Sequence, residues 1–309
     1  MSEESRLIDA LRALATHPGA RGLRDDVAVI PAPLGRDLVL THDMIVEGVH
    51  FLPADPPGDV AWKLLAVNLS DLAAKGASPI GVLMGYGMTG QADWDAGFIA
   101  GMARALDHFG VPLLGGDTVK QPAGDGRVLG LTAVGQVAPG TAPDRRGACP
   151  GDLLFVTGPI GDAGLGLRIA RGDIEGPRRL LKAYRLPMPR LAEGRQLAPI
   201  AHAMADVSDG LLIDALRIAN ASGLAVHVDL DRVPLSEAAL GFGKGRTARL
   251  AAATAGDDYQ LLCAVAPNDR LAAAAIAVEI GRFDSGSGLH VRDGDGQVPL
   301  PSSLGYEHG

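Results

Sequence analysis

The segment from Asp59 to Pro79 constrains the fold most, because a helix pattern is followed there directly by a strand pattern. Apolar residues recur at mixed spacings of three and four, as on one face of an amphipathic helix; they are Leu64, Leu65, Val67, Leu69, Leu72 and Ala73. Gly76 and Pro79 are typical of a helix end. Residues 79–88 then form a glycine-spaced strand pattern. This succession indicates an architecture that mixes helices with strands.

Asp71 is near the carboxyl end of the predicted helix, three residues after Asn68 and on the same face. The helix macrodipole disfavours a carboxylate there by up to about 1 kcal/mol. Two explanations remain open at this point. Either Lys75, four residues further on, offsets the charge, or a bound cation does. A cation would require other parts of the chain to supply further ligands.

The rest of the chain continues the alternation of helix and strand patterns. In the first half, helices are predicted at residues 5–16 and 92–109, and strands at 37–46, 111–114 and 127–137. The turn-rich residues 138–143 predict a boundary near residue 140, which gives domains 1–140 and 141–309. In the second half, strands are predicted at 152–157, 203–207, 224–230, 259–265, 277–283 and 289–291. Helical segments are predicted between residues 164 and about 198, at 211–221 and at 247–254. We therefore expect a two-domain fold of α/β (α+β) class.

Composition excludes several classes of protein. The net charge is −8 and no basic stripe is present, which argues against nucleic-acid binding. The two cysteines, Cys149 and Cys263, lack CxxC spacing, which argues against a disulfide framework or a zinc site. No run of 18 apolar residues occurs, and the N-terminal residues 1–17 resemble a polar amphipathic helix rather than a signal peptide. We expect a cytoplasmic protein without a membrane partner.

Acidic motifs occur where predicted strands or helices end. They contain Asp25 and Asp26, Asp43, Asp71, Asp117, and Asp206 with Asp209. Hard divalent cations prefer oxygen ligands, and sites with several cations suit phosphoryl transfer. Each motif also has an ordinary explanation: Asp25 and Asp26 or Asp117 as turn residues, and Ser208 or Asp209 as a helix cap. Asp43 lies within an apolar strand, where a charge needs a partner. Together the motifs predict a cation-rich phosphate site.

Other candidate phosphate contacts are weaker. No GxxxxGK[ST] sequence is present, and the glycine-rich residues 158–166 are more typical of a tight strand-to-helix connection than of a phosphate cradle. Arg145 and Arg146 follow the predicted boundary and suit either a phosphate contact or a solvated linker. His50, on a glycine-containing turn, is more often structural than a ligand in such a position. The predicted site therefore holds phosphate mainly through cations.

The motifs together resemble those of the thiamine-monophosphate kinase family, within the superfamily of aminoimidazole ribonucleotide synthetase and selenophosphate synthetase. The resemblance runs from about Arg24 to the C-terminus. It rests on DD, THD, EGVHF, VNLSDLAAKGASP, LLGGDT, PGD, TGPIGD, DVSDGL, GDDYQLL and GYEH, in that order. It implies an N-terminal α/β domain that pairs across a two-fold axis, forming a homodimer, and a C-terminal α/β domain. It also implies ATP-dependent phosphorylation of thiamine monophosphate to thiamine diphosphate, with several Mg²⁺ ions.

The resemblance assigns site residues by matching motif. The implied Mg²⁺ ligands are Asp26, Thr41, His42, Asp43, Asp71, Asp117, Asp206 and Asp209, with Asp71 bridging ions and Asp43 and Asp71 treated as the catalytic carboxylates. The implied ATP contacts are Gly116, Asp117, Arg145 and Ser208, and the implied thiamine-phosphate contacts are His50, Asp257 and Tyr306. Three positions depart from the family pattern: His42 stands for Thr, Asp257 for Glu and Arg24 for Gly. Imidazole is a poor Mg²⁺ ligand, so His42 would instead use its carbonyl or lie outside the metal shell.

The expected mechanism is direct in-line transfer, in which an oxygen of thiamine monophosphate attacks the γ-phosphorus of ATP. That oxygen is already ionised at neutral pH, so no general base is needed, and no phosphoenzyme is expected. Two rival hypotheses remain. One is another ATP-using enzyme of the superfamily with a different acceptor, although the absence of a cysteine before Cys149 disfavours selenophosphate synthetase. The other is a non-catalytic nucleotide-binding homologue.

Overall fold

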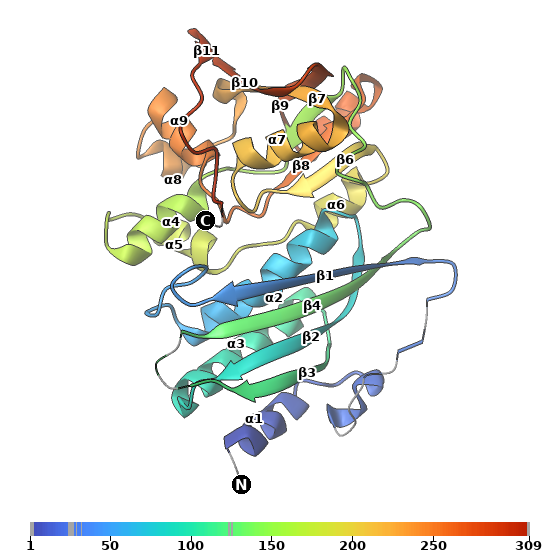
Figure 1. Cartoon of the computed structure of the whole chain (residues 1–309), viewed down its shortest axis with the longest axis vertical. Helices are drawn as coiled ribbons and strands as arrows, with labels where there is room; N and C mark the ends of the chain where they lie inside the picture. Colours follow the sequence, from blue (N-terminus) through green and yellow to red (C-terminus); the bar gives the residue numbers. More distant parts are fainter. Residues whose placement is uncertain are drawn as a thin grey trace. The chain divides into compact units, whose positions relative to one another are not determined.

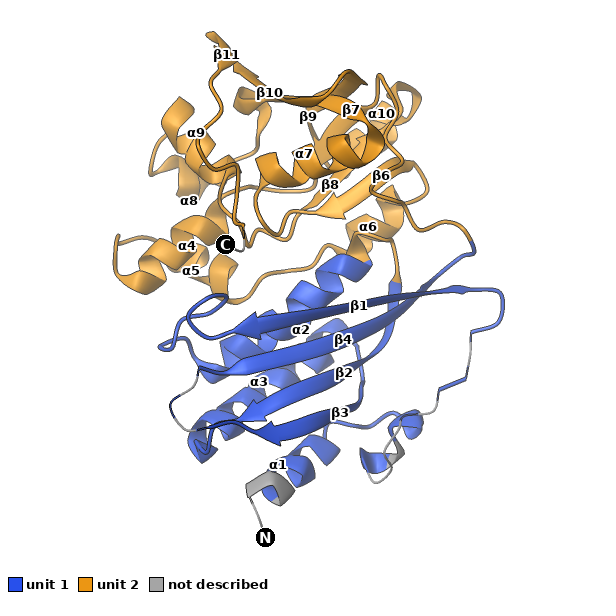
Figure 2. Ribbon diagram, viewed as in Figure 1, with its two compact units in different colours: residues 1–72, 78–139 blue, residues 73–77, 140–309 orange. Residues whose placement is uncertain are grey.

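The computed structural model describes residues 3–23, 28, 30–31, 33–122, 124 and 126–307. It divides into two compact units, of which the first comprises Met1–Leu72 and Ser78–Pro139 and the second Ala73–Ala77 and Gly140–Gly309 (Figures 1 and 2). Within the described residues, no helix has both the length and the apolar character needed to cross a membrane. Asp25 and Asp26 lie outside the described residues.

The first unit is built on a four-stranded sheet with the order β1-β4-β2-β3. Its strands are β1 (Asp37–Val46), β2 (Ser78–Met88), β3 (Leu113–Lys120) and β4 (Val128–Val137). The pair β2/β3 is parallel, whereas β1/β4 and β2/β4 are antiparallel. Its helical segments are α1 (Glu3–Arg12), η1 (Pro18–Leu23), α2 (Pro57–Ala73) and α3 (Ala92–Phe109).

Helices cover one face of this sheet, whereas the other face has several exposed apolar side chains. One face buries Ile45, Val82, Met84 and Leu131 beneath α2 and α3, which are drawn together on one side of the sheet in Figure 1. We call the opposite side the open face, because several of its apolar side chains are exposed: Leu38, Leu40, Met44, Leu83 and Val119. Because side chains alternate along a strand, the register fixes which residues share each face. That register decides the geometry of the candidate site.

The second unit contains a seven-stranded sheet with the order β11-β10-β7-β9-β5-β8-β6. Its strands are β5 (Leu153–Val156), β6 (Ala201–Asp206), β7 (Leu224–Asp229), β8 (Leu261–Val265), β9 (Val278–Ser285), β10 (Gly288–Asp293) and β11 (Gly296–Val298). Only β7/β10 is parallel among the pairs of these strands. Its helical segments are α4 (Asp162–Arg171), α5 (Arg178–Arg185), α6 (Leu191–Leu197), α7 (Leu211–Ser222), η2 (Leu230–Arg232), α8 (Glu237–Leu240), α9 (Arg246–Ala253), η3 (Pro267–Asp269) and α10 (Arg270–Ala274).

Both faces of the second sheet are covered. One core places Leu154, Ala205 and Leu262 against α7. The other places Phe155, Met204 and Cys263 against α6 and α10. The predicted two-domain α/β (α+β) class is therefore confirmed. The short segments β11, α8 and α10 were not predicted. The helical prediction from residue 164 to about 198 corresponds to three helices, α4, α5 and α6.

Candidate functional site

Three candidate cation ligands of the first unit, Thr41, Asp43 and Asp71, lie where β1 packs on α2. Thr41 and Asp43 are two residues apart on β1 and therefore point to the same face, towards α2. The Thr41 hydroxyl donates a hydrogen bond to the Asp71 carboxylate, and Asp71 is two residues before Ala73, the last residue of α2. All three side chains are partly exposed. Two carboxylates and a hydroxyl in one place are the oxygen donors that a hard cation requires.

Asn68 fixes Asp43 in this arrangement. Its fully buried side chain accepts a hydrogen bond from the backbone N–H of Asp43, with 2.9 Å between N and Oδ1. The Asn68 amide donates in turn to the carbonyl of Leu64, at 3.0 Å. Asn68 thus ties β1 to α2 at the level of the acidic residue. The sequence placed Asn68 beside Asp71, but did not reveal that it positions Asp43.

Lys75 has a different role from the one considered for it. Its Nζ donates to the carbonyl oxygens of Pro143 and Met204, each at 3.1 Å. These bonds connect the segment after α2 with the start of the second unit's chain and with β6. Lys75 therefore contributes to the folding of the second unit.

His42 is on the opposite face of β1 from Thr41 and Asp43. Its Nδ1 lies 2.9 Å from the Thr132 hydroxyl of β4, on the open face. The imidazole consequently does not join the Thr41, Asp43 and Asp71 group. A contribution from His42 to that group would have to come from its backbone carbonyl.

Asp117 is also separated from Asp43. The sheet order places β4 and β2 between β1 and β3, so three strand spacings, roughly 14 Å, separate the edges. The register aligns Asp117 with Gly85, Gly130 and Met44, which puts its side chain on the open face. Asp43 and Asp117 of one chain therefore do not share an ion.

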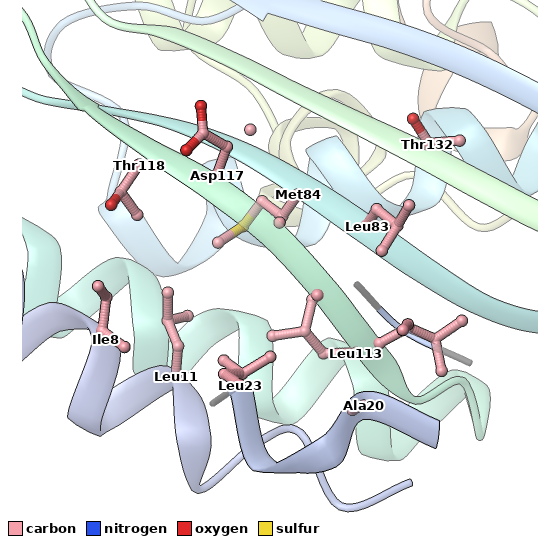
Figure 3. Close-up of a pocket in the computed structure, with 15 residues that line it drawn as sticks. Ile8, Leu11, Ala20, Leu23, Leu83, Met84, Leu113, Asp117, Thr118 and Thr132 are labelled. Carbon is pink, nitrogen blue, oxygen red and sulfur yellow. The ribbon is translucent and has the colours of Figure 1, made fainter. Parts of the chain in front are cut away.

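Gly116 and Asp117 line an open pocket of about 660 Å³. Figure 3 shows apolar side chains of α1, η1, β2 and β3 on one side of this pocket, with Asp117, Thr118 and Thr132 supplying polar groups. A Cβ at Gly116 would overlap the carbonyl oxygen of Met84, so β3 can approach β2 here only with glycine. This volume is within the usual range of small-molecule sites.

His50 is held by the turn that follows β1. Its Nδ1 accepts a hydrogen bond from the backbone N–H of Val46 at 3.0 Å, and its carbonyl accepts one from buried Lys63 at 2.8 Å. Gly48 permits this turn through its φ of 82°. The Nδ1 contact gives His50 a structural role in this turn.

In the second unit, Asp214 organises the turn that contains Ser208 and Asp209. Its buried Oδ2 accepts hydrogen bonds from the backbone N–H groups of Ser208, Asp209 and Gly210, at 3.1, 3.1 and 3.3 Å. Burial raises the pKa of Asp214, although the amide donors oppose that shift. Asp214 therefore fixes the turn before α7, whose N-cap residue is Gly210 and has no side-chain cap hydrogen bond, so neither Ser208 nor Asp209 is the helix cap considered in the sequence analysis.

Arg217 joins the same turn. Its Nη1 contacts Asp209 Oδ2 and lies 2.8 Å from Asp214 Oδ1. The sequence analysis did not single out Arg217. A carboxylate paired with an arginine is less available to a cation, so Asp209 would have to exchange this contact to bind one.

Three of the family motifs converge on this turn through backbone hydrogen bonds. The N–H of Asp257 donates to the Ser208 carbonyl at 2.8 Å, and the N–H of Tyr306 donates to the Asp209 carbonyl at 2.9 Å. A Cβ on Gly256 would lie 2.7 Å from the Ser208 oxygen, which explains glycine there. Asp206 ends the adjacent strand β6 and is buried. The second unit thus brings Asp206, Ser208, Asp209, Asp257 and Tyr306 into one neighbourhood.

Asp257 itself has strained backbone geometry. Its φ is 70° and that of Tyr259 is 48°, in the left-handed region that non-glycine residues rarely adopt. The Tyr259 hydroxyl donates to the Asp257 carboxylate at 3.0 Å. Such strain costs about 1–3 kcal/mol and is frequent at functional sites.

The structure shows different contacts for the remaining candidate phosphate-binding groups, which are Arg145, Arg146 and the glycine-rich turn. Arg146 pairs with Asp144 at 2.6 Å, and this contact lowers the pKa of Asp144 to about 2. Arg145 is exposed beside it, and its carbonyl accepts a hydrogen bond from Ser222. In the glycine-rich turn, Asp258 accepts from the N–H of Gly161 at 2.7 Å and of Ala163 at 3.4 Å. A protein carboxylate thus uses amides that a phosphate would need, which supports the prediction of a structural connection.

Comparisons with known proteins agree with both units. Residues 24–137 match the family model of the AIR synthase related protein, N-terminal domain, and residues 149–294 match that of the C-terminal domain. The thiamine-monophosphate kinase of Caulobacter vibrioides is 43% identical over 306 residues, covering 94% of this chain and 86% of the relative.

Solved structures give the same result. A crystal structure of thiamine-monophosphate kinase from Stenotrophomonas maltophilia K279a has a TM-score of 0.82 and 36% identity, covering 93% of this chain and 94% of that one. The structure named AaThiL complexed with AMPPCP and TMP has a TM-score of 0.79 and 28% identity, covering 99% of both chains. Identity of this level over nearly the whole length, in both units, establishes the relationship: the chain belongs to the thiamine-monophosphate kinase family.

Proposed function

We propose that this protein transfers the γ-phosphate of ATP to thiamine monophosphate and so forms thiamine diphosphate. The observation that carries the proposal is the near full-length identity of 43% to a thiamine-monophosphate kinase. The related structure that contains both AMPPCP and TMP supports direct transfer between two bound substrates. Use of ATP is consistent with a cytoplasmic location.

Mg²⁺ is the proposed cation. In the first unit Thr41, Asp43 and Asp71 would hold it, and the donor set fits, because all three offer oxygen and Thr41 already contacts Asp71. Asp26, outside the described residues, and Asp206 and Asp209 of the second unit remain proposed ligands. Bound Mg²⁺ would neutralise the repulsion between two anionic substrates and stabilise charge on the transferred group.

The protein's own groups have positioning roles in this mechanism. Asn68 orients β1 so that the Asp43 carboxylate stays beside α2. Arg145, Ser208 and the backbone at Gly116 would contact ATP, and the pocket of about 660 Å³ beside Gly116 and Asp117 would receive part of the nucleotide. No side chain needs to remove a proton, because the attacking phosphate oxygen is already ionised.

The thiamine end of the acceptor carries a positive charge. Asp257 is the proposed partner for it, together with His50 and Tyr306. The hydrogen bond from Tyr259 holds the Asp257 carboxylate. Aspartate is one methylene shorter than the glutamate common in the family, so we expect a bridging water or a shifted backbone at this contact.

A homodimer would explain the position of Asp117. One copy's Asp43 and Asp117 occupy opposite edges and opposite faces of the sheet, whereas the open face carries Asp117 and a group of exposed apolar side chains. Contiguous exposed apolar surface is typical of an interface. We therefore propose that two open faces pair and that Asp117 of a second copy completes each site by reaching the Asp43 group around the edge strand β1.

The direct test is ADP release, measured in a coupled assay with thiamine monophosphate as acceptor and thiamine as the control. We expect turnover only with the monophosphate and only with Mg²⁺. ADP release with a different acid and not with thiamine monophosphate would favour another enzyme of the superfamily. Calorimetric binding of ATP and Mg²⁺ with no ADP formed would favour a non-catalytic homologue.

A further inference from the structure

A mixed sulfur, nitrogen and oxygen cluster contains none of the residues proposed for phosphate transfer. Ligand atoms of Cys149, Asp152 and His202 are all within 4.8 Å of one another. Among the residues that the structure describes, no other group of three His, Cys, Asp or Glu side chains approaches this closely. Cysteine spacing in the sequence gave no sign of it, because only one of the three is a cysteine.

The backbone holds these side chains together. Asp152 closes a turn by donating its N–H to the Cys149 carbonyl at 3.1 Å, and its buried carboxylate accepts from the Cys149 N–H at 2.7 Å. A Cβ at Gly147 would overlap the His202 carbonyl, so this turn lies directly against the start of β6. The cluster is therefore preorganised by contacts that do not involve its thiol or imidazole.

The spacing suits a tetrahedral metal. His202 Nδ1 is hydrogen-bonded to the Asp152 carboxylate, 3.0 Å from each oxygen, so an ion bound by both groups would replace the proton that they share. The edge of a tetrahedron with bonds of 2.0–2.1 Å is roughly 3.3 Å, so the two ligands need little adjustment. Cys149 Sγ has only a long contact, 3.6 Å, to the Gly147 carbonyl. Both Cys149 and His202 are exposed, which gives an ion a path to the site.

We propose that Cys149, Asp152 and His202 bind a single Zn²⁺ ion, with water as the fourth ligand. The donor set selects the metal, since thiolate and imidazole suit Zn²⁺ whereas Mg²⁺ prefers oxygen alone. The site therefore distinguishes Zn²⁺ from the Mg²⁺ proposed for phosphate transfer. Bound Zn²⁺ would link β6, which contains His202, to the turn that contains Cys149 and Asp152 and follows Arg145 and Arg146. It requires loss of the thiol proton, so affinity should fall as pH decreases.

The test uses the reduced, chelator-treated full chain in excess Mg²⁺. Titration with Co²⁺ as a spectroscopic substitute should give a thiolate-to-metal charge-transfer band that saturates at about one equivalent, and Zn²⁺ should displace it. Cys149→Ser should abolish the band, and His202→Gln should weaken Zn²⁺ binding at least about tenfold. His108→Gln, a histidine variant in the first unit, is the matched control and should bind as the unmodified chain does.

A second measurement needs no variant. Zn²⁺ should protect exposed Cys149 from alkylation, as followed by mass spectrometry, while buried Cys263 provides the internal reference. Absence of a thiolate band in the unmodified chain would overturn the proposal. So would a band or a Zn²⁺ affinity that is the same in Cys149→Ser, or alkylation of Cys149 at the same rate with and without Zn²⁺.

Discussion

Dimers that combine two different inactive variants give the sharpest test of the proposed site, because the fraction of activity that they should regain can be calculated. Asp71 is on α2 beside β1, whereas Asp117 is on β3 at the other edge and on the open face. If each site uses Asp71 of one chain and Asp117 of the other, then Asp71→Asn and Asp117→Asn are inactive as homodimers. A mixed dimer, however, has one site that contains neither substitution.

The expected magnitude follows from counting. Random exchange of equal amounts makes about half of the dimers mixed, and each regains one of its two sites, so about a quarter of the unmodified activity should return. The two variants are unfolded together, refolded, and assayed for ADP release with thiamine monophosphate. Each variant refolded alone and added at assay time is the control.

Two results would refute this reasoning. If activity stays at the level of the separate variants although mixed dimers are detected by mass spectrometry, both aspartates act within one chain. If the protein is a monomer at assay concentrations and fully active, the open face is not an interface that the site requires.

Three further predictions concern single residues. Asp71→Asn should lower kcat more than about 100-fold, the scale of losing one transition-state electrostatic contact, and a fully active variant would contradict the assignment. Asn68→Leu should cost about 1–3 kcal/mol in urea unfolding, because the Asp43 N–H loses its acceptor, and should also lower kcat; loss of stability with unchanged kcat would show that Asn68 does not position Asp43 for catalysis. Burial raises the pKa of Asp258 from 3.8 to about 8, so its ionisation opposes folding. The stability difference between the unmodified chain and Asp258→Asn is therefore most favourable to the unmodified chain near pH 4. This difference in the free energy of unfolding should decline as pH rises towards 8, by up to about 1.4 kcal/mol per pH unit. A difference that stays the same at every pH would contradict the raised pKa.

Local sequence patterns predicted much of the fold. The helix containing Asp71 and the strand containing Asp43 were both predicted, and the carboxylate does lie close to the carboxyl end of α2. Because side chains alternate along a strand, His42, between Thr41 and Asp43, must point to the opposite face of β1. These features depend on a few neighbouring residues, so a single sequence suffices to read them.

Other features depend on which segments meet. The contacts of Lys75 with the carbonyls of Pro143 and Met204 join positions far apart in the chain. Asp258 binds backbone amides of the glycine-rich turn that the sequence analysis had considered for a phosphate, and Asp214 binds the amide of Ser208, a contact that the sequence analysis did not consider. No local pattern specifies such pairings.

By itself, the sequence determined the class of the fold, the family and the residues that can supply oxygen ligands, because these follow from residue type, periodicity and motif order. Only the tertiary structure decided that Asn68 orients Asp43, that Asp117 is on a distant edge of the sheet, and that Cys149, Asp152 and His202 form a cluster. The physical reason is that strand order and turn packing are set by burial of apolar surface between distant segments. Those contacts, rather than local conformational preference, choose the neighbours of each functional side chain.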